Sequence, residues 1–328
     1  MVEWGTGDLV RRVERVLDTA GAAIDLLEEA PRELDLEGLE APPDKVAAET
    51  AMLLRAVVGI PAEHRLGASV SALASRLNAH ARGARTLLGI ALHPALARDY
   101  AAAHLALSAA GWPAPEVDEV LARSLRASAG GRERLPHREL EQAHLARLGG
   151  ETAVTEGDLL GRTALATGVD LLTGSRDDIY ALTHAVFYAT DFGRETVPLP
   201  RPADQILAEL TSALAGAIDD DDFDLAGELL VAWPALSLEW NEVSTFAFHV
   251  LARVEDEVGR LPSLSINGRD YHSKATGLRN HYVTATTYHP AYVMGLLCSV
   301  CLQRSHYPPR DIRGAPYPDE LVDGVLAE

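Results

Sequence analysis

Hydrophobic residues recur every three or four positions through most of the chain, and this spacing predicts helices. Proline and glycine divide the chain into segments of helical length, and no segment shows the two-residue alternation of a β-strand. The sequence therefore predicts an all-α protein. The predicted helices are 6–30, 45–58, 67–88, 94–110, 115–128, 136–148, 156–173, 176–192, 203–218, 223–232, 240–258, 274–287 and 290–304.

Histidines recur at a spacing of 40 residues, which is the length of one helical hairpin. Repeated helical hairpins either stack as an open α-solenoid or close as an α/α toroid. We expect the closed toroid, because the residues that stand out chemically gather in 180–300 instead of spreading along one concave face. The evenly spaced histidines are His64, His104, His144 and His184, and His249 and His289 form a further pair.

The chain is expected to form one structural domain with three parts. Residues 1–44 comprise a helix and a proline-containing loop that pack on the ring of hairpins. Residues 45–307 form the ring itself. The proline-rich segment 308–328 is predicted to run over it as an extended strap.

Charge and composition limit the classes of partner. The chain has 48 acidic and 29 basic residues, a net charge of −19. This argues against binding to nucleic acid or to an anionic membrane surface, because both require a basic face. No apolar run approaches the roughly 20 residues of a spanning helix, and the first residues lack a signal-peptide pattern. We therefore expect a cytoplasmic protein that binds a small molecule or a peptide.

The segment 176–192 carries the most informative pattern. Tyr180, His184, Tyr188 and Asp191 follow one stripe of the predicted helix, with His184 and Asp191 about 10 Å apart. A carboxylate in a last helical turn is opposed by the helix dipole, so Asp191 requires a strong partner. Two interpretations stay open. Asp191 forms a structural ion pair with Arg194 or a neighbouring helix, or it orients the imidazole of His249 or His289.

Two further regions supply candidate chemistry. His289 precedes Pro290, which predicts a helix start, where the helix dipole favours a neutral imidazole. Lys274 stands out because the chain contains only two lysines. The expected catalytic residues are His184, Asp191, His249, His289, Tyr188 and Lys274, and the expected substrate-binding residues are Tyr180, Glu242, Tyr288 and Trp240.

A divalent metal is a second possibility for the same pocket. The side chains of His184, Asp191, His249 and His289 are suitable ligands for zinc or iron. No two of them are separated by three or four residues, so the spacing alone does not require a metal.

Three segments resemble an uncharacterised actinobacterial family, all-helical and often encoded near genes of specialised metabolism. They are LPHRELEQAHL at 135–145, THAVFYATDFGR at 183–194 and YHPAYVMGLLC at 288–298, and the resemblance extends over roughly 10–305. The layout is also similar to that of α/α-toroid proteins such as terpenoid and lanthionine cyclases. The chain lacks the aspartate-rich motifs of the former and the zinc-binding cysteine and histidine set of the latter, so neither activity is carried over.

These observations favour an enzyme of specialised metabolism. We expect His and Asp side chains in a central pocket to perform acid–base chemistry on a partly apolar metabolite, in a lyase, cyclase or hydrolase reaction. The alternatives are a divalent-metal enzyme in the same pocket and a non-catalytic helical-repeat protein that binds a peptide or a partner protein.

Overall fold

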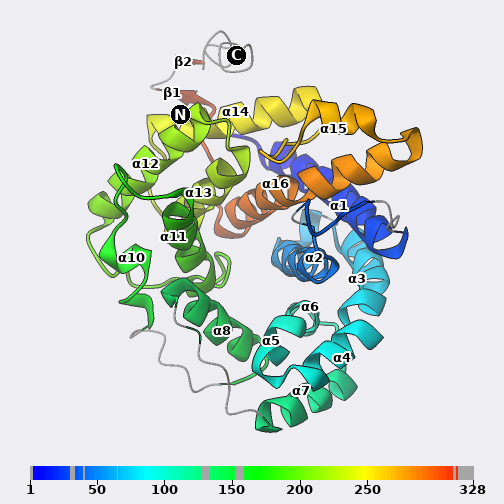
Figure 1. The fold of residues 1–328 in the computed structure, drawn as a ribbon. Helices are drawn as coiled ribbons and strands as arrows, with labels where there is room; N and C mark the ends of the chain where they lie inside the picture. Colours follow the sequence, from blue (N-terminus) through cyan, green and yellow to red (C-terminus); the bar gives the residue numbers. More distant parts are fainter. Residues whose placement is uncertain are drawn as a thin grey trace.

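The computed structural model describes residues 3–29, 34–39, 41–64, 66–127, 133, 135–151, 159–312 and 315–316. These residues form an all-α structure, as the hydrophobic spacing predicted (Figure 1). None of their helices combines the length and the apolar character that a transmembrane span requires.

The helices range from the four-residue α5 and α10 to the 29-residue α16. They are α1 (Thr6–Glu29), α2 (Pro43–Val58), α3 (Gly67–Ala81), α4 (Ala84–Leu92), α5 (Ala97–Tyr100), α6 (Ala102–Ala109), α7 (Pro115–Ala127), α8 (Pro136–Leu148), α10 (Ala164–Thr167), α11 (Arg176–Ala189), α12 (Ala203–Asp219), α13 (Phe223–Leu236), α14 (Glu242–Val258), α15 (Gly268–Ser273) and α16 (Thr276–Arg304), with 3-10 turns at Ala62–His64 and Pro94–Leu96. Two-residue strands, β1 (Asp311–Ile312) and β2 (Ala315–Pro316), pair antiparallel, with Asp311 opposite Pro316 and Ile312 opposite Ala315.

Three predicted helices differ from the observed ones for local reasons. The segment 67–88 is broken at Gly83, whose backbone is extended and where a Cβ atom would lie 2.3 Å from the carbonyl oxygen of Ala79. The segment 94–110 is divided into a 3-10 turn, α5 and α6. In 156–173, residues 156–158 lie outside the described part, and Ala164–Thr167 is the helical stretch that follows Thr163.

The largest difference concerns α16. The segments 274–287 and 290–304 were predicted to be separate helices, but they form one helix that continues through Pro290. Its residues from Thr284 to Leu302 are almost all buried, so tertiary packing outweighs the hydrogen bond that proline removes.

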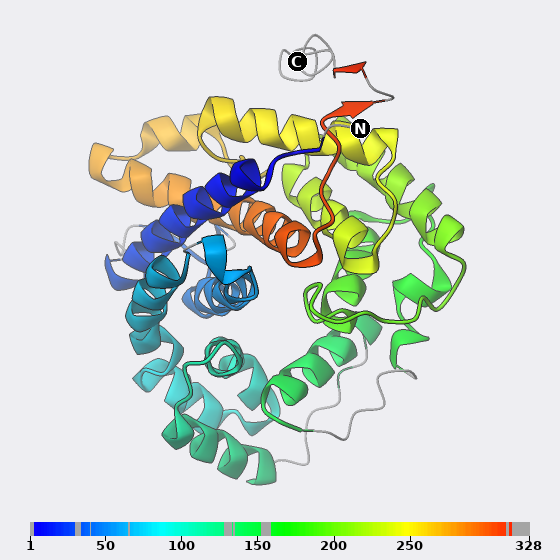
Figure 2. The same cartoon turned by 180° about the vertical axis from the view of Figure 1, so that it is seen from behind.

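Six helices surround the middle of the molecule. Helix α2 packs on α6, α6 on α8, α8 on α11, α11 on α13, α13 on α16, and α16 returns to α2. Outside them, α1 packs on α16, α3 on α2, and α12 and α14 on α13 (Figures 1 and 2). The six helices therefore present one face each to a shared interior.

The two ends of the described chain meet over α14. The backbone N–H of Trp4 donates to the carbonyl oxygen of Pro308 at 3.0 Å, and Glu3 forms a β-bridge with Pro309 (Figure 2). The ring of Trp4 lies edge-on against Phe248. Of the predicted strap at 308–328, residues 313–314 and 317–328 lie outside the described part.

Candidate active site

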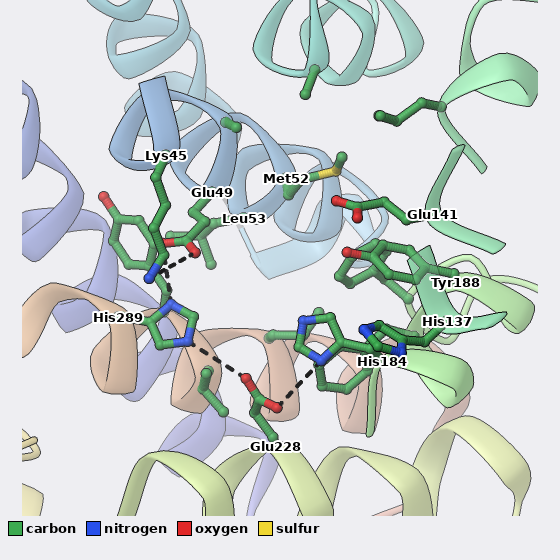
Figure 3. A pocket seen from close by; sticks show the side chains of 18 of the residues that line it. Lys45, Glu49, Met52, Leu53, His137, Glu141, His184, Tyr188, Glu228 and His289 are labelled. Atoms are coloured by element: carbon green, nitrogen blue, oxygen red, sulfur yellow. Dashed lines mark ion pairs between the residues drawn. The ribbon is translucent and has the colours of Figure 1, made fainter. Parts of the chain in front are cut away.

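A cavity of about 450 Å³ lies among the six central helices. Its apolar wall comes from the inward faces of α2, α8, α11 and α16 and includes Met52, Leu53, Leu145, Phe187, Phe192, Val293 and Leu296. Polar side chains gather at two places on this wall. One group contains Lys45, Glu49, His184, Glu228 and His289, with His137 beside His184 (Figure 3). The other contains Asp99, Arg138, Glu141 and Tyr188. An apolar wall with two polar regions is typical of a small-molecule site.

The first polar region centres on His289, which lies inside α16 and not at a helix start. Its Nδ1 is 3.1 Å from Oε2 of Glu49. Its Nε2 is 3.4 Å from Oδ1 of Asp224 and 3.5 Å from Oε1 of Glu228. We call Glu49, Asp224, Glu228 and His289 the histidine–carboxylate cluster. It joins α2, α13 and α16.

Neighbouring donors fix the two carboxylates of α13. The hydroxyl of Thr183 donates to Oε2 of Glu228 at 2.6 Å. Arg176 donates to Oδ2 of Asp224 at 3.4 Å and to both carboxylate oxygens of Asp222. Asp224 and Glu228 thus each have one oxygen held by a donor and the other directed at His289.

His184 shares Glu228 with His289, although the two histidines come from different helices. Its Nδ1 donates to the carbonyl oxygen of Tyr180 at 3.0 Å and lies 3.7 Å from Oε2 of Glu228. The ring of Tyr180 covers it, with ring centroids 3.9 Å apart. The second nitrogen, Nε2, points away from Glu228 toward the cavity (Figure 3).

Burial and charge shift the pKa values of these groups in opposite directions. Burial lowers the pKa of His184, and the attraction of Glu228 only partly offsets it. Burial also disfavours the charged form of His289, but Asp224, Glu49 and Glu228 together raise its pKa well above the usual value. The pKa of Glu228 is lowered because His184 and His289 outweigh the effect of burial. Two imidazoles beside one carboxylate therefore differ in their affinity for a proton.

The second polar region lies across the cavity on α8 and α11. Glu141 forms an ion pair with Arg138 and a hydrogen bond with the hydroxyl of Tyr188. Burial raises the pKa of Glu141, and it also raises the pKa of Asp99 on α5. Tyr188, which the sequence predicted as a site residue, thus lies on the cavity wall opposite the cluster (Figure 3).

Asp191 has a different partner from the two histidines expected for it. Its two carboxylate oxygens accept hydrogen bonds from Arg55 of α2 at 2.8 and 2.6 Å, and His144 lies 3.5 Å away. The interpretation as an ion pair to a neighbouring helix describes this geometry. The expected bond to His249 or His289 was wrong, because His249 contacts Trp4 and Pro309, whereas His289 contacts the cluster.

Four other predicted residues lie away from the cavity wall. Trp240 stacks between Trp233 and His306 and donates to the latter at 3.0 Å. Glu242 lies in the first turn of α14. Lys274 follows α15, with its ammonium 5.8 Å from the ring centroid of Tyr282. The fourth is His249, also on α14. The structure thus brings together His184, His289, Tyr180 and Tyr188, with Tyr288 buried beside Glu49.

The sequence analysis missed the acidic members of the cluster. Asp224 and Glu228 are four residues apart, so they share one face of α13. Glu228 is also the single acid in the run LAGELLVAWPAL, where a charge is costly to bury without partners. Glu49 interrupts the apolar surface of α2 in the same way. An acid within an apolar helix was the signal for Glu49 and Glu228, whereas Asp224 follows the acidic run at 219–222 and does not stand out from it.

The sequence model of a family described as a domain of unknown function, DUF6895, matches residues 13–299. This range contains every member of the histidine–carboxylate cluster and every residue that lines the cavity. No curated protein and no solved structure matches the chain.

Proposed function

The chain belongs to the DUF6895 family, and we propose that it is an enzyme that binds a partly apolar small molecule and transfers a proton through His184. The observation that carries the proposal is the placement of His184, which is held by Tyr180 and Glu228 and faces a cavity whose wall is apolar between two polar regions. A cavity of about 450 Å³ suits a small molecule better than a folded partner.

His184 acts as the general base. Because Nδ1–H donates to the carbonyl oxygen of Tyr180, the lone pair of the neutral ring lies on Nε2. After Nε2 accepts a proton, the carboxylate of Glu228 stabilises the resulting imidazolium, as an orienting carboxylate does in other histidine-based sites. Glu228 is therefore a positioning residue and not the base itself.

The two polar regions bind the two ends of the ligand. The apolar body contacts Phe187, Val293 and Leu296, while a polar group lies near Glu141 and Tyr188. Abstraction of a proton from a bound substrate begins a lyase or cyclase reaction, and abstraction from a bound water begins hydrolysis. The resemblance of the sequence to proteins encoded near specialised-metabolite genes supports a substrate from that metabolism.

We also propose that the helices form a closed α/α toroid. The cycle of contacts from α2 through α6, α8, α11, α13 and α16 back to α2 supports closure over an open solenoid. In this arrangement Asp191 has a structural role, because it ties the turn after α11 to Arg55 of α2.

The test uses wild-type protein and the variant His184→Gln in a metabolite extract prepared in D₂O. Mass spectrometry then identifies metabolites that are consumed or that gain deuterium. We expect the wild type to change at least one metabolite and the variant to lose a factor of about 100 or more in rate, which is typical for a positioned acid–base group. The variant should still bind that metabolite.

His93→Gln is the matched control, because His93 is exposed and stacks on Tyr100 outside the cavity wall. It should react like the wild type. Equal turnover by the wild type and His184→Gln would contradict the role of His184. Binding of a metabolite without any chemical change or exchange would instead identify a non-catalytic binding protein.

A further inference from the structure

We infer that the histidine–carboxylate cluster binds a divalent transition-metal cation, with Nε2 of His289, Oδ1 of Asp224 and Oε1 of Glu228 as its protein ligands. None of the comparisons and none of the sequence motifs assigns this site. It differs from the set His184, Asp191, His249 and His289 considered from the sequence, because only His289 belongs to both.

The distances among the three atoms suit one ion. Nε2 of His289 lies 3.4 and 3.5 Å from the two carboxylate oxygens, and the candidate ligand atoms all lie within 4.8 Å of one another. Around a tetrahedral zinc ion with bonds of about 2.0–2.1 Å, neighbouring ligand atoms are separated by about 3.4 Å. Small side-chain adjustments therefore suffice to place all three at bonding distance.

Each ligand side chain is already oriented by a second contact. Thr183 holds the other oxygen of Glu228, and Arg176 holds the other oxygen of Asp224. The oxygen of Asp224 that faces His289 is buried and makes no hydrogen bond within the described part of the chain. Without a metal, the charge that faces this oxygen is the imidazolium of His289, 3.4 Å away, and a divalent cation bound at Nε2 would take the place of its proton.

Glu49 completes the arrangement from the opposite side of the imidazole. Its Oε2 lies 3.1 Å from Nδ1 of His289. A metal bound at Nε2 would leave this Nδ1 protonated, so it could donate to Glu49. Histidines that bind metals commonly donate their second N–H to a carboxylate, which fixes the tautomer and orients the ring. Glu49 is therefore assigned as a positioning residue for the ligand His289.

The cluster is accessible, and its ligand number leaves room for a substrate. His289 lines the cavity of about 450 Å³ together with Glu228, and it lines a second cavity of about 570 Å³ together with Asp224. Three protein ligands leave at least one coordination position for water or a substrate oxygen. A cation at this point would polarise that oxygen next to His184.

The donor set selects the class of ion. One imidazole and two carboxylates suit Zn²⁺, Mn²⁺ or Fe²⁺. Mg²⁺ and Ca²⁺ prefer oxygen ligands throughout and retain more water, so they should bind more weakly here.

The experiment is a calorimetric titration of the full chain, freed of metal with a chelator and dialysed, with ZnCl₂, MnCl₂ and MgCl₂ in turn. We expect one site per chain for Zn²⁺ and Mn²⁺ and weaker binding of Mg²⁺. Glu49→Gln should weaken binding of Zn²⁺ by about 10–100-fold, and Asp224→Asn and His289→Gln should weaken it at least as much. Electron paramagnetic resonance of Mn²⁺ provides a second, independent measurement of Mn²⁺ binding to the wild type.

Asp220→Asn is the matched control, because Asp220 is an exposed acid near the start of α13. It should bind like the wild type, and circular dichroism should verify that each variant is helical. Absence of Zn²⁺ and Mn²⁺ binding by the wild type, or unchanged binding by folded Asp224→Asn and Glu49→Gln, would overturn the inference. The Zn²⁺ titration of Asp224→Asn and the exchange assay of His184→Gln are separate measurements, so failure of the metal site and failure of the proposed base are separate results.

Discussion

Arg55 of α2 and Asp191 after α11 form a bidentate ion pair, with Nη1–Oδ1 and Nη2–Oδ2 distances of 2.8 and 2.6 Å. Both side chains are buried, with exposed fractions of 9% and 8%. The pair connects the helix that carries Glu49 to the helix that carries His184. It therefore fixes the distance between two walls of the cavity without itself belonging to the polar region around His289.

Asp191→Asn should destabilise the fold. The change leaves the guanidinium of Arg55 buried without a counter-charge, which typically costs about 3–5 kcal/mol. Asparagine tolerates the positive φ of 49° at this position, so backbone strain should contribute little. Urea denaturation measures the free energy of unfolding. Arg123→Gln, which breaks an exposed pair with Glu119, is the control and should cost less than about 1 kcal/mol.

His144 should make stability depend on pH. Burial lowers the pKa of its imidazole in the folded protein to about 3, although Asp191 partly opposes this. The unfolded chain takes up this proton below about pH 6.5, whereas the folded chain does not. The contribution of the neutral His144 ring to the free energy of unfolding is therefore complete above about pH 6.5. It decreases by about 1.4 kcal/mol per pH unit as the pH falls toward 3.

Unfolding free energies measured between pH 7 and pH 4 test this dependence. His144→Gln should show a smaller loss of stability on acidification than the wild type. His93→Gln, at an exposed position, should retain the slope of the wild type. Equal slopes in all three proteins would assign the acid sensitivity to carboxylates instead.

Gly193→Ala should destabilise the turn after α11. Gly193 has a φ of 80°, and an added Cβ would lie 2.4 Å from a side-chain carbon of Val300. We expect a loss of at least about 1–3 kcal/mol, the usual range for overpacking. Gly216→Ala is the contrasting variant, because a Cβ there meets no atom and the residue lies within α12. The higher helix propensity of alanine should raise the free energy of unfolding by about 0.5–1 kcal/mol. Thermal unfolding of both variants compares the two effects.

Thr183→Val should weaken the support of Glu228. The valine has a similar shape but removes the hydroxyl that donates at 2.6 Å to Oε2. A buried acceptor that loses its donor costs about 1–3 kcal/mol. Thr183→Ser keeps the hydroxyl and should stay closer to the wild type in thermal unfolding. A valine variant as stable as the wild type would contradict a contribution from this hydrogen bond, because valine loses only the hydroxyl whereas serine loses only the methyl group.

The sequence predicted the helical class correctly because apolar spacing is a local property. The predicted helix boundary at Pro290 was wrong, because the helix α16 continues through this proline. Its continuation depends on burial against other helices, which local sequence does not reveal. The same error placed His289 at a helix start. There the dipole would favour the neutral ring, but carboxylates from two other helices raise the pKa of His289 instead.

Part of the candidate site was accessible from the sequence. Tyr180, His184 and Tyr188 share one helical stripe, and that stripe faces the cavity. The 40-residue spacing of His249 and His289 misled, because His249 lies on α14 and contacts Trp4 and Pro309 instead of the cavity. Similar spacing on two helices does not reveal which face each helix turns inward, since that depends on the neighbours.

Because α16 packs against α1, α2 and α13, these helices cannot complete their packing until α16 has been synthesised. A ribosome releases the chain from the N-terminus, so α1 and α2 emerge long before the helix that covers their apolar faces. Neither His289 nor the apolar surface of α16 exists until nearly all residues are translated. Premature termination before α16 should therefore leave a fragment with exposed apolar surface that aggregates unless chaperones bind it.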